Sequence, residues 1–221
     1  MARGGFWTEL WLARWALLHG LAVTAEVAAV VILLGTLLGL AGGLVLAYGW
    51  APLRWLVRLL VDVMRGIPVL VLILFWYYGL ALFGVNLPPT WAGIVALGGF
   101  CGAHMSEVVR GAIQSVPDGQ NEAAKAIGLR FPQRLAYVIL PQATRRMLPP
   151  WVNAAVEMVK ATTLLSIIGV VELLLATQQT IARNYMTIQF YLAAGALYVA
   201  LNFAISQLGA LLERRFAHLR Y

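Results

Sequence analysis

Five long apolar stretches constrain this chain more than any other feature of its sequence. A helix needs about 20 mostly apolar residues to cross the ~30 Å hydrocarbon core of a bilayer. The stretches that reach or approach this length are 21–48, 67–85, 90–106, 150–173 and 184–212. They are continuous, whereas a membrane β-barrel consists of segments of about ten alternating residues. The sequence therefore predicts an all-α membrane protein with five transmembrane helices.

The composition supports this class. Charged residues make up 11% of the chain and hydrophobic residues 62%, whereas about 25% of an ordinary soluble domain is charged. The single cysteine, Cys101, excludes an internal disulfide and a thiolate metal cluster. In a soluble protein the net charge of +7 would point to a nucleic acid partner, so the positions of the basic residues must be considered first.

The basic residues are distributed unevenly between the apolar stretches. Lys and Arg accumulate on the cytoplasmic side of membrane proteins. The larger group follows the first, third and fifth stretches and comprises Arg54, Arg58, Arg65, Arg110, Lys125, Arg130, Arg134, Arg145, Arg146, Arg214, Arg215 and Arg220. The opposite side has Arg3, Arg14 and Arg183, with Lys160 inside the membrane. We therefore predict an N terminus outside, a cytoplasmic C terminus and no nucleic acid partner.

The two ends of the chain flank this membrane domain. Residues 1–19 are interrupted by charges, which argues against a signal peptide. Trp7, Trp11 and Trp15 share one helical face, which is typical of an interfacial helix anchored in lipid. We therefore expect an N-terminal interfacial helix at 1–19, a transmembrane domain at 20–213 and a cytoplasmic tail at 214–221.

The segment 107–146 is too polar to cross the membrane, but it carries clear signals for the ends of helices. Asp118 is expected to cap the start of a short helix, and Gly128 is expected to take the left-handed position after its end. Pro132 suits the first turn of a second helix, which Pro141 is expected to terminate. The segment thus predicts two short helices outside the membrane.

The surface of the first short helix suits contact with another protein. Ala123 and Ala124 permit close approach of a partner's backbone, and Glu122 and Lys125 beside them set the register. On composition alone, a solvated connector explains the segment equally well.

Several motifs indicate a family. Glu122-Ala123-Ala124, then Gly128, then Ile139-Leu140-Pro141 resembles the EAA loop of ABC importer permeases. Further stretches resemble the polar amino acid group of these permeases, with Ile67 in place of the usual Thr: Arg65-Gly66-Ile67-Pro68, Glu107-Val108-Val109-Arg110-Gly111-Ala112-Ile113-Gln114-Ser115-Val116-Pro117, Lys160-Ala161-Thr162-Thr163-Leu164, Ile168-Gly169-Val170 and Glu172-Leu173.

The resemblance implies a fold and a set of partners. It implies the MetI-like fold of a type I ABC importer permease in a prokaryotic inner membrane, transporting polar amino acids such as histidine, glutamine or arginine. The EAA coupling loop would cover about 115–141, with Glu122, Ala123, Ala124 and Gly128 coupling the chain to an ATPase. The implied partners are two copies of an ATP-binding cassette subunit, a second permease in a homo- or heterodimer, an extracytoplasmic amino-acid-binding protein and membrane lipid.

The chain itself lacks the groups that an enzyme needs. Neither of its two lysines, Lys125 and Lys160, follows a glycine, so the phosphate-binding loop of an ATPase is absent. The three histidines lie in or beside different segments and form no catalytic group with a serine and an aspartate. We therefore expect no enzymatic activity, no metal and no cofactor in this chain, with ATP hydrolysis in a partner polypeptide.

Ionisable residues inside a membrane are costly and commonly mark a transport path. If the fourth span begins near Pro150, Lys160 lies ~15 Å deep, near the midplane of the bilayer. Glu157 and Lys160 are then candidate substrate contacts together with Thr162, Thr163 and Ser166. Their spacing of three residues equally allows the two charges to neutralise each other.

One residue departs from the family pattern in this region. Ala161 stands where the permeases usually have Asp, which removes a carboxylate that would pair with a cationic substrate. The sequence therefore does not fix whether the substrate is cationic. As a hypothesis, Glu157 supplies the missing charge from one helical turn earlier.

Two further patterns predict packing and local pairing. Gly35, Gly39 and Gly43 repeat every four residues and form a smooth face for close helix contact. Asp62 lies four residues after Arg58 and three before Arg65, which favours a local ion pair.

Two alternatives to an amino acid importer remain at this point. The coupling motif is shared more widely than the other motifs, so a permease for methionine or another small substrate fits as well. A secondary transporter or channel working alone is the second alternative, although the inverted repeats common in such proteins are not evident.

Overall fold

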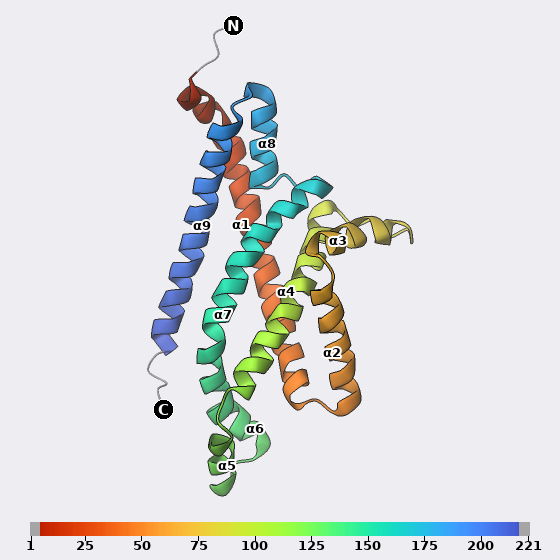
Figure 1. Cartoon of the computed structure of the whole chain (residues 1–221), viewed down its shortest axis with the longest axis vertical. Helices are drawn as coiled ribbons and strands as arrows, with labels where there is room; N and C mark the ends of the chain where they lie inside the picture. The colour runs from red at the N-terminus through yellow and green to blue at the C-terminus, as the bar shows by residue number, and fades with distance from the viewer. Residues whose placement is uncertain (1–4, 217–221) are drawn as a thin grey trace. The chain divides into compact units, whose positions relative to one another are not determined.

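The computed structural model describes residues 5–216, and this part of the chain is almost entirely helical (Figure 1). The elements in chain order are α1 (Phe6–Tyr48), α2 (Ala51–Gly66), α3 (Val69–Leu74), the π-helix η1 (Phe75–Gly79), α4 (Pro89–Gln114), α5 (Asp118–Ala126), α6 (Phe131–Arg134), the π-helix η2 (Leu135–Ile139), α7 (Leu140–Ala161), the 3₁₀-helix η3 (Thr162–Ile168), α8 (Leu173–Asn184) and α9 (Thr187–Phe216). The predicted all-α class is confirmed.

Four helical stretches of the described chain are long and apolar enough to cross a membrane. They are Phe6–Tyr48, Pro89–Gln114, Phe131–Ile168 and Thr187–Arg215. A fifth is formed if α2 and the stretch Val69–Gly79 count as one span, although these two are bent by 105°. The bend follows from Pro68, which lacks an N–H and forces the preceding Ile67 into an extended conformation.

The helix boundaries differ from the expected ones. The helices of the second stretch end at Gly79 and not at residue 85, because a turn with Gly84 in the left-handed region follows. The third stretch extends to Gln114. The fifth stretch continues to Phe216, so the expected tail at 214–221 begins inside α9, and 217–221 lie outside the described residues.

Pro141 does not end the second short helix, contrary to the prediction. Instead α6, η2, α7 and η3 form one helical stretch from Phe131 to Ile168. In η2 the backbone N–H of Leu140 bonds the carbonyl of Leu135, five residues earlier. This wider turn shifts the hydrogen-bond register, and Pro141 falls in the first turn of α7, where a missing N–H costs little.

The first helix is longer than a membrane is thick. Its 43 residues extend about 64 Å at 1.5 Å per residue. Residues 6–19 of the expected interfacial helix belong to this same unbroken helix, and 1–4 lie outside the described residues. Trp7, Trp11 and Trp15 are exposed, and the guanidinium of Arg14 lies 3.9 Å from the centre of the Trp11 ring. The interfacial location itself stays a prediction.

The chain divides into two compact units, which we describe separately. The first comprises α1 up to Leu33, then Pro68–Gly98, and Val156–Ala204. The second comprises Leu34–Ile67, Gly99–Ala155 and α9 from Ile205.

Close helix contact through glycines organises the second unit. A Cβ added to Gly35, Gly39 or Gly43 would overlap a side chain of α4, namely Cys101, Met105 or Val109 respectively. At Gly43 the added Cβ would lie 2.5 Å from the Cβ of Val109. The three glycines therefore let the backbones of α1 and α4 approach, which confirms their predicted packing role.

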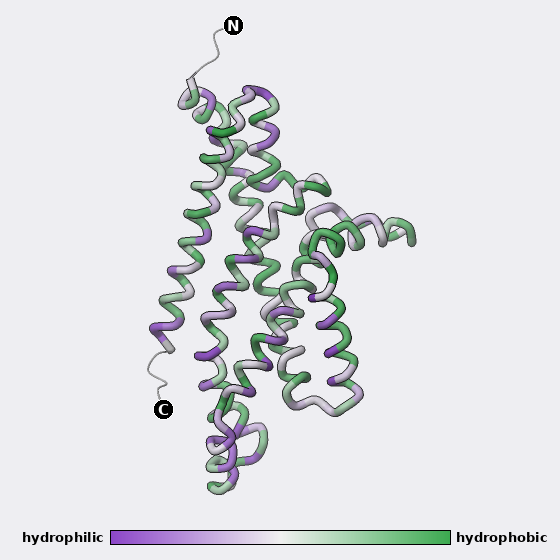
Figure 2. Tube along the Cα trace, in the orientation of Figure 1, coloured by the Kyte–Doolittle hydropathy of each residue, from purple (hydrophilic) through white to green (hydrophobic). Residues whose placement is uncertain are grey.

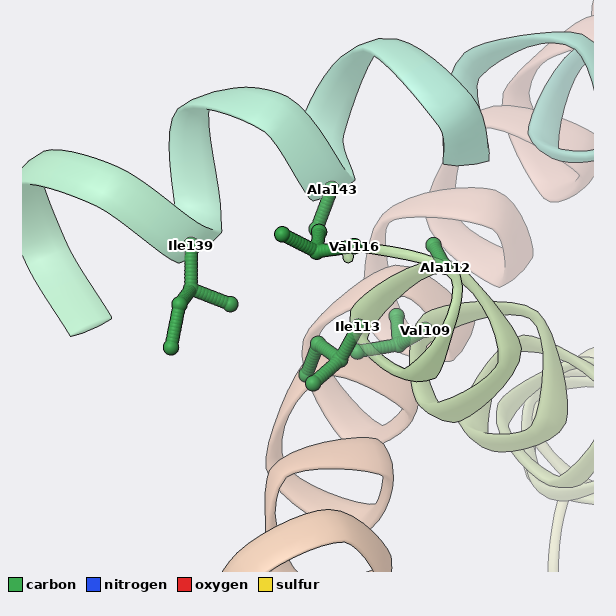
Figure 3. Packing of buried hydrophobic residues seen from close by; sticks show 6 residues of the cluster. All are labelled: Val109, Ala112, Ile113, Val116, Ile139 and Ala143. Carbon is green, nitrogen blue, oxygen red and sulfur yellow. The ribbon is translucent and has the colours of Figure 1, made fainter. Parts of the chain in front are cut away.

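The ends of α4 and the start of α7 share a small apolar core in the same unit. It contains Val109, Ala112, Ile113, Val116, Ile139 and Ala143 (Figure 3). Because Val116 precedes and Ile139 follows the segment that carries α5 and α6, this core anchors the base of the predicted coupling loop.

Candidate functional site

Helix α5, the centre of the predicted coupling loop, has well-defined ends. Pro117 occupies the N-cap position, so the prediction of Asp118 as the cap is wrong; Asp118 is the first helical residue, where its charge complements the helix dipole. At the other end Gly128 has φ +83°. The N–H of Gly128 donates to the carbonyl of Lys125 at 2.9 Å, and the N–H of Leu129 donates to the carbonyl of Ala124 at 3.1 Å. These two bonds form a Schellman motif, and the left-handed position that the sequence predicts for Gly128 is confirmed.

The EAA residues divide between the inside and the outside of the loop. Ala124 is buried, whereas Glu122, Ala123 and Gly128 are exposed. The small Ala124 thus lets α5 rest on the loop beneath it, and Glu122 and Ala123 remain free to contact a partner.

Two large residues beside this surface were missed by the sequence reasoning. Ile127 is 77% exposed at the end of α5, and Tyr137 in η2 is 75% exposed. Exposed apolar and aromatic side chains of this size are common anchors in protein interfaces. The helix-end signal at Gly128 could have identified Ile127, whereas the direction of Tyr137 depends on the π-helix.

Side-chain contacts hold α5 against the rest of the loop. The Nη1 atom of Arg134 donates to Oδ1 of Asn121 at 3.0 Å, and its guanidinium lies 5.8 Å from the centre of the Phe131 ring. Phe131 in turn contacts Tyr48 edge-to-face with ring centres 5.1 Å apart. The loop is therefore tied both to itself and to the end of α1, so that α5 is fixed relative to α1 and α6.

A charged network joins α2 to α4, and it was also missed. Glu107 accepts hydrogen bonds from Arg58 of α2 and from Arg110 one turn along α4. The expected local pair of Asp62 with Arg58 and Arg65 is wrong, since Arg58 bonds Glu107 and no ion pair of Asp62 occurs among the described residues. The contact is non-local, so sequence spacing did not predict it.

The candidate substrate contacts lie on α7 and η3. Glu157 and Lys160 are both exposed. The ion pairs within the described part of the chain are those of Glu107, so Glu157 and Lys160 do not neutralise each other. Both charges are therefore available to a ligand.

The three hydroxyl groups of this region bond to their own helix. Thr162 donates to the carbonyl of Val159, Thr163 to that of Lys160 and Ser166 to that of Thr163, each at 2.7 Å. Thr162 is fully buried, whereas Thr163 and Ser166 are partly exposed. Because their protons are already used, the two accessible hydroxyls offer acceptor lone pairs to a ligand ammonium group.

A buried carboxylate organises the first unit. Glu172 is 0% exposed and caps α8 by accepting from the N–H groups of Leu174 and Leu175 at 2.9 Å. The hydroxyl of Tyr198 in α9 donates to it at 2.6 Å, and the N–H of Leu173 donates to Thr24 of α1 at 3.1 Å. Glu172 thus ties α8 to α9 next to a contact with α1.

Replacing Glu172 with alanine is expected to lower the free energy of unfolding by about 3 kcal/mol, because three partly buried donors lose their acceptor. Glu172→Gln, which keeps one acceptor oxygen, should cost less. Thermal unfolding of the purified protein measures the difference, with Glu157→Gln as the exposed control. Equal melting temperatures for all variants would contradict the structural role of Glu172.

No group of three or more His, Cys, Asp or Glu residues suited to a metal occurs within residues 5–216. The arrangement instead has an exposed surface on α5 and, within the described residues, two charges on α7 without an ion pair.

Comparison with known proteins assigns this arrangement to a family. The family described as "Binding-protein-dependent transport system inner membrane component" matches residues 32–218. The chain belongs to this family. It is therefore a multi-pass transport subunit of the inner membrane, in a family of ABC permeases that are not enzymes.

Individual relatives cover nearly the whole permease. The octopine transport system permease protein of Rhizobium radiobacter is 36% identical over 92% of this chain and 87% of its own length. The glutamine transport system permease protein of Escherichia coli is 32% identical, with coverage of 95% and 96%. A crystal structure of an amino acid ABC transporter with histidines matches with a TM-score of 0.84 and 32% identity, over 90% of this chain and 94% of that one. The predicted permease fold is confirmed.

Proposed function

We propose that this permease imports polar amino acids across the inner membrane, driven by ATP hydrolysis in a separate subunit. The main support is α5, a short helix with fixed ends whose Glu122 and Ala123 are exposed in a protein of the permease family. The names of the relatives, which include glutamine and octopine permeases, support an amino acid substrate.

The proposed complex follows from the coupling role of α5. Two ATP-binding cassette subunits bind the EAA residues of two permeases, which are identical or homologous and enclose one path. Glu122, Ala123 and Gly128 form the contact, whereas Ala124, which the sequence also placed on the surface, is buried and packs α5 against the loop. This chain holds no cofactor. A loaded extracytoplasmic binding protein docks on the opposite side.

The proposed orientation has five spans, with α2 and the stretch Val69–Gly79 counted together, the N terminus outside and the C terminus in the cytoplasm. The basic residues favour it, because Arg134, Arg145 and Arg214 then lie on the cytoplasmic side. In this orientation α5 faces the compartment that contains ATP.

Uptake by the purified permease, reconstituted with its ATPase and binding protein, tests this function. We expect accumulation of a radiolabelled polar amino acid only with ATP on the ATPase side, and co-purification of the ATPase with a tagged permease. Uptake driven by an ion gradient without ATP would identify a secondary transporter and overturn the proposal.

Glu157 and Lys160 are the proposed substrate contacts. Lys160 pairs with the substrate carboxylate, while Glu157 and the acceptor oxygens of Thr163 and Ser166 face positive charge. Ala161 leaves this stretch without the usual carboxylate, so Glu157 acts as the acidic group for a cationic side chain.

Replacing Glu157 with glutamine is expected to lower arginine uptake about tenfold, because a hydrogen bond to a charged group is worth about 1.5 to 3 kcal/mol. Glutamine uptake should change little, since its side chain is neutral. Competition between the two labelled substrates in the reconstituted system gives the ratio. An equal loss for both would remove the special role of Glu157.

A further inference from the structure

A groove of about 550 Å³ lies between α7 and the last turns of α9. Its lining residues are Arg145, Pro149, Ala210, Glu213 and Arg214, all of them in the second unit. Toward the middle of the helices, Gly209 lies directly against Val152 and leaves no room for a Cβ. The two helices are therefore in close contact at Gly209 and Val152. Nearer the end of α9, the small side chain of Ala210 leaves space for the groove.

The charged residues of this groove have no ion-pair partner within residues 5–216. Among the described residues, neither Arg145, Glu213 nor Arg214 takes part in an ion pair or a side-chain hydrogen bond. Arg146, the neighbour of Arg145, instead donates to the carbonyl of Ser115. Two guanidinium groups from different helices and one carboxylate thus surround an open space with a net positive charge.

The leucines near the end of α9 indicate how deep the groove lies, although they point away from it on the opposite side of the helix. Leu208, Leu211 and Leu212 are exposed, and the chain becomes hydrophilic in the last turn of α9 (Figure 2). A row of exposed leucines that ends in Glu213 and Arg214 matches the passage from acyl chains to headgroups. The groove therefore lies where the phosphate groups of a bilayer are found.

We propose that this groove binds the headgroup of a membrane phospholipid. Arg145 and Arg214 hold the phosphate, because guanidinium groups form paired hydrogen bonds to phosphate oxygens. Glu213 accepts the ammonium group of phosphatidylethanolamine. The volume falls in the range of about 300–1,000 Å³ found for ligand sites, and basic grooves between helices commonly bind such headgroups.

The proposal extends beyond transport itself, and only the choice of the cytoplasmic leaflet rests on the proposed function. Since α7 begins at Leu140, at the end of the coupling loop, a bound lipid links α9 to the helix that follows the ATPase contact. Lipid composition thereby affects the stability of this pair of helices.

Native mass spectrometry of the intact importer in detergent, with phosphatidylethanolamine or phosphatidylglycerol added, tests the site. The double variant Arg145→Gln and Arg214→Gln is expected to retain about 25-fold less of either lipid, from about fivefold per arginine near a membrane surface. The matched control is Arg54→Gln with Arg215→Gln, which removes two exposed arginines that do not line the groove. Glu213→Gln should weaken retention of phosphatidylethanolamine alone.

Three results would overturn the proposal. The first is equal lipid retention by the double variant and its matched control. The second is complete displacement of the lipid by millimolar inorganic phosphate, which would identify a site for a free anion. The third is a disulfide between two permeases through Ala210→Cys, which would make the groove a contact between copies. The experiment measures bound lipid and not transport. Its result therefore tests the lipid site even if the proposed amino acid transport is wrong.

Discussion

Replacing Glu122 with lysine is expected to abolish ATP-driven uptake while the permease stays folded in the membrane. Glu122 is exposed on α5 and has no ion pair among the described residues, so its loss costs the permease no internal contact. Breaking a buried charged contact in an interface costs about 2 to 5 kcal/mol, and charge reversal adds repulsion. Uptake and ATPase binding should therefore each fall by about 30-fold or more.

The rigid attachment of α5 makes this effect large. The Schellman motif at Gly128 and the bond from Arg134 to Asn121 fix the helix, so the loop cannot easily move Glu122 away from a repelling partner. The exposed side chains of Ile127 and Tyr137 lie in the same loop and would keep the ATPase near the reversed charge.

Uptake into proteoliposomes and co-purification of the ATPase measure the result. Asp62→Lys is the matched control, because Asp62 is also exposed and unpaired among the described residues but lies on α2, outside the loop. Glu122→Gln should have a smaller effect. Normal uptake and normal ATPase binding by the lysine variant would show that α5 is not the coupling helix.

The sequence predicts the helices of this fold well because each signal is local. Apolar runs identify the long helices, and the spacing of Gly35, Gly39 and Gly43 predicts a close helix contact. Gly128 likewise predicts the end of α5, since a left-handed residue is needed there.

The failed predictions depend on contacts or geometry that local patterns do not contain. Arg58 is four residues from Asp62 but bonds Glu107, because the packing of α2 on α4 brings the carboxylate of Glu107 within reach. Pro141 normally predicts a helix end, yet the π-helix before it shifts the register and the helix continues. Glu172 appeared only as part of a motif, since its burial depends on Tyr198 of α9.

The candidate site was predicted only in part, because some of its features are local in the sequence and others depend on the fold. The EAA residues are contiguous, so sequence identified Glu122 and Ala123 as exposed, but it also placed Ala124 on the surface, whereas the structure buries it against the loop. The availability of Glu157 and Lys160 required the structure, because their spacing alone allowed mutual neutralisation. Both groups of residues lie on or beside one helical stretch, Phe131–Ile168, which directly follows α5 in the chain.

Replacing Gly39 with leucine is expected to prevent stable packing of α1 on α4. Even a Cβ at this position would overlap the Cβ of Met105 and lie 3.0 Å from its backbone carbonyl carbon. Backbone atoms cannot move aside as a flexible side chain can, so the two helices must separate. Overpacking of a core usually costs about 1 to 3 kcal/mol, and a side chain of this size at a backbone contact should exceed the upper value.

A matched set of variants separates this contact from a general effect of losing glycine. Gly195→Leu in α9 is the control, since a Cβ there meets no atom within 4 Å. Gly39→Ala should be destabilising and should recover part of its loss when combined with Met105→Gly, which removes the overlapping Cβ. Thermal unfolding and membrane levels of the four variants provide the comparison. Equal stability of Gly39→Leu and Gly195→Leu would show that the close approach of α1 and α4 does not require glycine at position 39.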